Sequence, residues 1–150
     1  MPGRSTGKKE SAAIRLQLPS RYGYEKIAME AAATLAEIMG FTPARVEDLR
    51  TAVSEACINA MEHGNKLNAH QCVEVVIVPG RRTLSIEVRD NGGGFDVRCK
   101  KDPDIEKKLA GEESPRGWGL FIIKRLVDRV DFKTKPHRGH VTTLTMRLQK

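Results

Sequence analysis

Three polar side chains, Glu55, Asn59 and His63, recur at intervals of four residues in the segment EACINAMEHG of this 150-residue chain. That spacing places them on nearly one side of a helix. A carboxylate there could accept a proton from an attacking hydroxyl or water. An amide oxygen one turn later suits Mg²⁺ when nucleotide phosphates supply the other oxygens. Taken singly, each residue also has a structural interpretation: Glu55 and Asn59 on a solvated helix face, and His63 capping the helix end before Gly64.

A second candidate is Asp90, at the end of the predicted strand TLSIEVRD. Apolar residues alternate to one face of this strand, and the same period puts Asp90 on that face. A carboxylate there needs a hydrogen-bond donor, because burying it unpaired is costly. Asp-Asn-Gly is also excellent turn chemistry, so a turn-capping role stays open. Gly92 to Gly94, followed by Phe95, would let a flat ligand approach bare backbone.

A third candidate is the segment RGWGL, Arg116 to Leu120, ahead of a predicted helix. Amides of Gly117 and Gly119 at a helix N-terminus would form an anion site, and Arg116 adds a cation. A loop-to-helix hinge explains the segment equally well. It is not the G-x-G-x-x-G fingerprint, because Ile122 occupies the third glycine position and no strand runs directly into it. The N-terminal GRSTGKK is likewise one residue short of a Walker A loop.

Composition limits the function classes. A chain of 150 residues fits one domain, and 26 Lys and Arg against 19 Asp and Glu give a net charge of +7. That charge permits an anionic ligand, an acidic partner or nucleic acid. The basic pairs fall in predicted loops or at the terminus without interleaved aromatic residues, which argues against direct nucleic-acid binding.

Three cysteines without metal-ligand spacing argue against a zinc site or a disulfide framework. We find neither a signal peptide nor a membrane-length apolar run, and expect a cytoplasmic protein.

The elements that must position these candidates follow from periodicity and capping. Residues 12–20 alternate as a half-buried strand, and apolar residues recur at helical spacing from Tyr24 to Met39 before Gly40. Thr42 as N-cap and Pro43 predict a second helix that runs to Gly64. Its buried stripe would be Val46, Leu49, Val53, Ala56 and Ala60.

The second half of the chain adds a hairpin over residues 72–90, a helix after RGWG with Leu120, Ile123, Val127 and Val130 inward, and a closing hairpin over residues 130–150. We therefore predict an α+β fold, a two-layer sandwich with helices on one face of a mostly antiparallel mixed sheet. Residues 1–11 would be a flexible N-terminus and residues 12–150 a single domain. The charged segment from Val97 to Pro115 has few apolar anchors and would be a mobile loop.

Together and in this order, the three candidate segments resemble the N, G1 and G2 boxes of the Bergerat-fold ATPases, the superfamily that includes gyrase, MutL and the histidine kinases. The single-domain length and the forms SEAxxNAxxHG and RGxGLxIIxxLVD are similar to those of the anti-sigma factor serine kinases. The resemblance covers roughly residues 12 to 148. Each box alone would be ambiguous, and the conjunction of all three is highly specific.

This resemblance implies ATP and Mg²⁺ as cofactors and assigns roles to the candidates. Asp90 would accept a hydrogen bond from the adenine amino group, and Asn59 would hold Mg²⁺ on the phosphates. Glu55 would be the general base. The other expected nucleotide-binding residues are His63, Gly92, Gly94, Phe95, Arg116, Gly117, Gly119 and Leu120. Residues 97–115 would correspond to the ATP lid.

The implied function is a protein serine/threonine kinase that phosphorylates an anti-sigma factor antagonist and sequesters a sigma factor or similar regulator, with a homodimer favoured. An alternative is a nucleotide-gated binding module with little or no phosphoryl transfer. A third hypothesis, the detached catalytic domain of a histidine kinase, ranks lower because the chain has no dimerising helical hairpin with a phosphoacceptor histidine.

Overall fold

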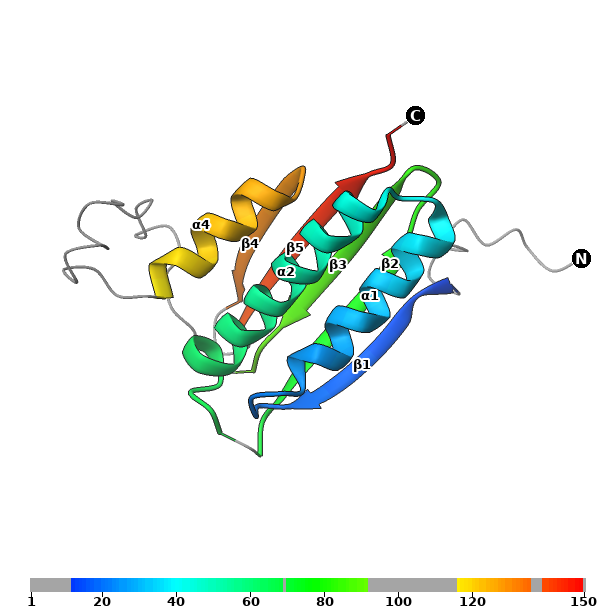
Figure 1. Ribbon diagram of the computed structural model, residues 1–150. Helices are drawn as coiled ribbons and strands as arrows, with labels where there is room; N and C mark the ends of the chain where they lie inside the picture. The colour runs from blue at the N-terminus through cyan, green and yellow to red at the C-terminus, as the bar shows by residue number, and fades with distance from the viewer. Residues whose placement is uncertain (1–11, 69, 92–115, 136–138, 150) are drawn as a thin grey trace, which may run out of the picture.

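Five strands form one open sheet with the order β1-β2-β3-β5-β4, and helices cover one of its faces (Figure 1). The computed structural model describes residues 12–68, 70–91, 116–135 and 139–149. The strands are β1 Ile14–Pro19, β2 Cys72–Pro79, β3 Thr83–Arg89, β4 Arg129–Lys135 and β5 Gly139–Arg147. Every pairing in this order is antiparallel. The predicted two-layer α+β fold is confirmed, and the parallel pair that a mixed sheet would need is absent from the described strands.

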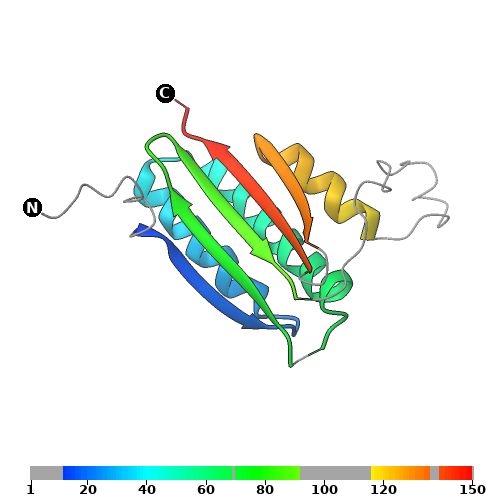
Figure 2. The ribbon, with the colours of Figure 1, turned by 180° about the vertical axis from the view of Figure 1, so that it is seen from behind.

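Within the described residues, three α-helices form the second layer: α1 Glu25–Met39, α2 Pro43–Asn59 and α4 Arg116–Leu126. Figure 2 shows the other face of the sheet, which no described helix covers. The predicted caps are confirmed: Gly40 ends α1 with a left-handed φ of 95°, and Thr42 Oγ1 accepts a hydrogen bond from the backbone N–H of Arg45. The chain thus leaves α1 and enters α2 where its sequence predicts.

Helix α1 buries a face of small side chains. Its alanines at 28, 32, 33 and 36 are fully buried, whereas Ile27 and Ile38 are 51% and 76% exposed. The apolar spacing from Tyr24 to Met39 therefore predicted the helix correctly, but Ile27 and Ile38 do not lie on its buried face. Small side chains let α1 lie close to its neighbours in a densely packed layer.

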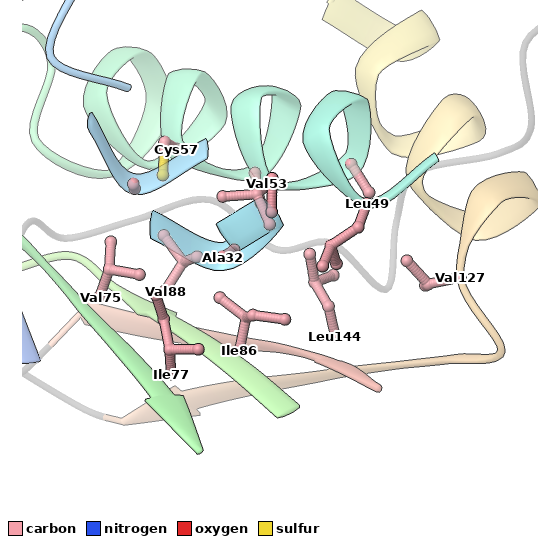
Figure 3. Close-up of a cluster of buried hydrophobic side chains, with 14 of the residues drawn as sticks. Ala32, Leu49, Val53, Cys57, Val75, Ile77, Ile86, Val88, Val127 and Leu144 are labelled. Atoms are coloured by element: carbon pink, nitrogen blue, oxygen red, sulfur yellow. The ribbon is translucent and has the colours of Figure 1, made fainter. Parts of the chain in front are cut away.

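The core lies between α2 and the sheet. Leu49, Val53 and Cys57 of α2 point toward the apolar side chains of the central strands (Figure 3). These strand residues are Val75, Ile77, Ile86, Val88 and Leu144. The predicted stripe of α2 is buried throughout, and so are Leu120, Ile123 and Val127 around α4, while Val130 packs against the core from β4. Helices α2 and α4 are thereby fixed over the strands that carry Asp90 and its neighbours.

The predicted second helix changes form before it ends. After Asn59 the chain continues as a π-helical turn, η2 Ala60–Gly64, which closes with a 2.9 Å hydrogen bond from Asn65 N–H to Ala60 O. Single π turns within helices are frequent at functional sites. Helix α4 differs as well: it begins at Arg116, so Gly117 and Gly119 lie inside its first turn and not in a turn before it. Residues 1–11 and the predicted lid at 97–115 lie outside the described residues, and their predictions stay untested.

Candidate nucleotide-binding site

Asp90 is buried, at 5% exposure, directly after β3. Its Oδ1 accepts a hydrogen bond of 3.2 Å from the backbone N–H of His140, and its own N–H donates to His140 O at 3.1 Å. The His140 imidazole lies beside it, with Nδ1 3.8 Å from Oδ2. The donor that a carboxylate on the apolar face requires is therefore supplied across the sheet by β5.

Two glycines allow the Asp90 carboxyl group to fit. A Cβ added at Gly64 would lie 2.1 Å from Cγ and 2.3 Å from Oδ2 of Asp90. One added at Gly139 would lie 2.2 Å from Asp90 O and 2.6 Å from Oδ1, and Gly139 has a left-handed φ of 86°. No other residue type fits either position without displacing Asp90. Gly64, the end of the opening motif, thus touches the second candidate segment directly.

The first and third candidate segments meet at Gly119. A Cβ added there would lie 3.0 Å from Glu55 Oε2 and 3.2 Å from both Oδ1 and Nδ2 of Asn59. The first turn of α4 therefore lies against the polar stripe of α2, at the end of the molecule where η2 lies in both views (Figures 1 and 2). Backbone N–H groups at the start of a helix donate hydrogen bonds to anions, so this junction suits phosphate groups.

The polar side chains at this junction keep capacity to bind a ligand. Asn59 is buried, and its Nδ2 has no hydrogen-bond partner within the described part of the chain. The pKa of Glu55 is raised above its ordinary value, first by burial and then by the nearby charge of Glu62. A raised pKa makes the ionised carboxylate a stronger base. An amide oxygen and a carboxylate are also hard donors of the kind that Mg²⁺ accepts beside phosphate oxygens.

A pocket connects the two parts of the site. Asn59 lies on its wall together with Asp90, and Ala56, Leu120, Ile123 and Phe132 add apolar surface. Ala60 of η2 and His140 and Thr142 of β5 complete the lining. An apolar cleft with a few polar groups is the usual form of a small-molecule site. The β5 residues and Phe132 were not predicted from the sequence, because only strand pairing brings them beside Asp90.

The remaining candidates divide into two groups. His63 lies in η2, half-buried, and Leu120 is a buried pocket residue in α4. Arg116 and Gly117 form the start of α4. Gly92, Gly94 and Phe95 lie outside the described residues. The described candidates therefore converge on one end of the α2–α4 layer.

The sequence matches a known family. The family model of the histidine kinase-like ATPase domain matches residues 18–148. The chain belongs to this family. Serine-protein kinase RsbW of Bacillus cereus (strain AH820) is 34% identical over 144 residues, covering 91% of this chain and 86% of the relative. RsbW of Bacillus subtilis (strain 168) is 30% identical over 135 residues, covering 88% and 83%. The resemblance inferred from the three boxes, to RsbW-like kinases within the ATPase family, is confirmed, and the family implies use of ATP.

Two solved structures share the fold of this histidine kinase-like domain. The RsbU and RsbW domains of a Mycobacterium tuberculosis protein align with a TM-score of 0.64 at 19% identity, covering 92% of this chain and 33% of that longer chain. The SiaB–SiaC complex of Pseudomonas aeruginosa aligns with a TM-score of 0.65 at 14% identity, covering 89% and 88%. At such identities the likeness supports the fold alone. None of the described helices is both long and apolar enough to span a membrane.

Proposed function

We propose that this protein is an ATP-dependent serine kinase that phosphorylates a small anti-sigma factor antagonist and, in its other role, sequesters a sigma factor or similar regulator. The observation that carries the proposal is the meeting of Gly119 with Glu55 and Asn59, one of which, Asn59, lines the same pocket as Asp90. A kinase needs a base, a phosphate site and a group that binds the nucleotide base, and these residues would supply all three. The RsbW relatives are named serine-protein kinases, which favours serine as the acceptor.

Each residue has a distinct part in the proposed reaction. Asp90 accepts a hydrogen bond from the adenine amino group, and the first turn of α4 binds the phosphates. Glu55 takes the serine hydroxyl proton while the serine oxygen bonds to the γ-phosphorus and the bond to ADP breaks. Asn59 would hold Mg²⁺, which neutralises phosphate charge when bound. The raised pKa of Glu55 fits its use as a base, and the unpaired Nδ2 of Asn59 fits a hydrogen bond to a phosphate oxygen.

Phosphate transfer to a partner tests the proposal. We would incubate the protein with Mg²⁺ and γ-labelled ATP, adding in turn each small protein encoded beside it. We expect one of them to gain label on serine. Binding that depends on nucleotide without any labelled product would instead favour the sequestering module.

The nucleotide anchor is tested separately by calorimetry with ATP on Asp90→Asn. An amide would leave its own donors unpaired against the adenine amino group, so affinity should fall by about tenfold or more. Asp131→Asn is the matched control, because Asp131 lies on β4 and pairs with Arg129 at 2.9 Å. Equal ATP affinity in the two variants would remove Asp90 from the site.

A further inference from the structure

A buried amide network lies directly behind Asp90. Asn65, only 2% exposed, is the first residue after η2. Its Nδ2 donates hydrogen bonds to Ser20 Oγ at 2.9 Å and to Cys72 O at 3.2 Å, and its Oδ1 accepts one of 2.8 Å from the backbone N–H of Asn91. One side chain thus joins the exit of β1, the start of β2 and the exit of β3.

Consecutive residues of η2 and its exit hold consecutive residues of the β3 exit. Gly64 lies against the Asp90 carboxyl group, where a Cβ would reach within 2.3 Å of Oδ2. The next residue, Asn65, binds the N–H of Asn91, which belongs to the same peptide unit as the Asp90 carbonyl. The side chain of Asp90 and the peptide that follows it are therefore both set by this short segment.

We propose that Asn65 is a positioning residue for nucleotide-base recognition. By fixing the peptide after Asp90, it keeps the carboxylate aligned toward the adenine amino group, so losing it would weaken discrimination between bases and not only stability. The inference rests on the proposed function, in which Asp90 contacts adenine. A hydrogen bond between neutral groups contributes about 1 kcal/mol, and a buried N–H left without its acceptor costs more.

Two nucleotides that differ at one group separate positioning from support. ATP carries an amino group at C6 of its base, whereas inosine triphosphate carries a carbonyl oxygen at C6, which cannot donate a hydrogen bond to a carboxylate. We would measure both affinities on each protein sample by competition. The ratio of the two affinities does not depend on how much of a variant is folded.

Asn65→Ala should lower the preference for ATP about fivefold or more, the equivalent of one lost hydrogen bond. Ser20→Ala is the matched control, because it removes another partner of the same amide and leaves the bond to Asn91 in place. We expect it to lower stability and keep the wild-type preference. Asn65→Asp keeps an acceptor for Asn91 N–H and should restore the preference relative to Asn65→Ala.

Three results are informative. An unchanged preference in Asn65→Ala would show that Asn65 only supports the fold, and the inference would be wrong. An equal loss in Ser20→Ala would assign the effect to loop packing and overturn it as well. Wild-type protein that binds both nucleotides equally would contradict the adenine role of Asp90 itself, which is the proposed function and not the role of Asn65.

Discussion

The polar side chains at the two ends of α2 differ in whether they find partners within the protein. At the N-terminal end, Arg45 donates a 2.7 Å hydrogen bond to Asp128 Oδ2, and Asp128 also accepts from Arg147 N–H at 2.6 Å. At the C-terminal end, Asn59 keeps a buried Nδ2 without a partner in the described residues, and burial raises the pKa of Glu55. The first turn of α2 is thus bonded to residues outside the helix, whereas polar groups of its last turn are available to a ligand.

This difference separates support from function. Buried polar groups are normally satisfied within the protein, so an unsatisfied amide beside a half-buried carboxylate is where the proposed function expects a ligand. At the other end Arg45 Nε is also buried without a hydrogen-bond partner in the described residues, but the charge of Arg45 is paired with that of Asp128. Substitutions at the two ends should therefore affect different measurements.

The largest expected effect is on phosphoryl transfer. Glu55→Gln keeps the size and hydrogen-bonding reach of the side chain but cannot take a proton, so the transfer rate should fall by about 10² or more while ATP still binds. Single-turnover transfer to the antagonist and ATP calorimetry would measure the two. Glu47→Gln, in the N-terminal half of the same helix and paired with Arg50, is the control and should transfer at the wild-type rate. Full activity in Glu55→Gln would mean that Glu55 is only a surface residue of α2.

Crowding of Asp90 from the end of η2 should be the next largest effect. The Cβ in Gly64→Ala would meet the Asp90 carboxyl group at 2.1 Å, so we expect a loss of about 1–3 kcal/mol in unfolding free energy together with weaker ATP binding. Gly80→Ala is the matched control: its Cβ would meet Thr83 Oγ1 at 2.6 Å in the β2–β3 turn. It should cost stability and leave ATP affinity unchanged. Equal ATP affinities in the two variants would argue against Gly64 as part of the site.

The N-terminal end of α2 should respond in stability alone. Arg45→Ala removes a partly exposed ion pair and its hydrogen bond, which should lower the unfolding free energy by about 1 kcal/mol. Urea denaturation measures this change, with ATP affinity and transfer rate expected at wild-type values. A transfer defect in folded Arg45→Ala protein would show that the two ends of α2 are coupled.

The smallest effect concerns pH. Because the folded pKa of Glu55 is raised, ionising this group opposes folding, and the stability it allows at low pH is lost as pH rises through the folded pKa. Glu55→Gln imitates the protonated form, so it should be more stable than wild type at pH 7, by less than about 1 kcal/mol since the group is partly solvated. The difference should vanish below about pH 4, beneath the ordinary glutamate pKa of about 4.3. Denaturation at both pH values tests the sign, and a variant less stable than wild type at pH 7 would contradict it.

Much of the scaffold was predictable because it depends on neighbours in the sequence. Strand alternation through Val88 correctly put Asp90 on the buried face, and Thr42 and Gly40 marked helix boundaries that the structure confirms. The order of the three boxes identified the family before any geometry was known. The roles assigned to individual residues within those boxes stay predictions, and the experiments above are their tests.

Sequence periodicity could not show what completes the site. The π turn at η2 includes a hydrogen bond from Asn65 to Ala60 that competes with the ordinary helical pattern. Asp90 contacts Gly139 and His140, which lie about fifty residues later in the sequence. These contacts arise because β5 lies between β3 and β4 in the sheet. Asn65 likewise reaches Ser20 and Asn91 only through the sheet order. Local spacing fixes which face a side chain takes along its own element, whereas its partners across the sheet follow from the packing of the whole chain.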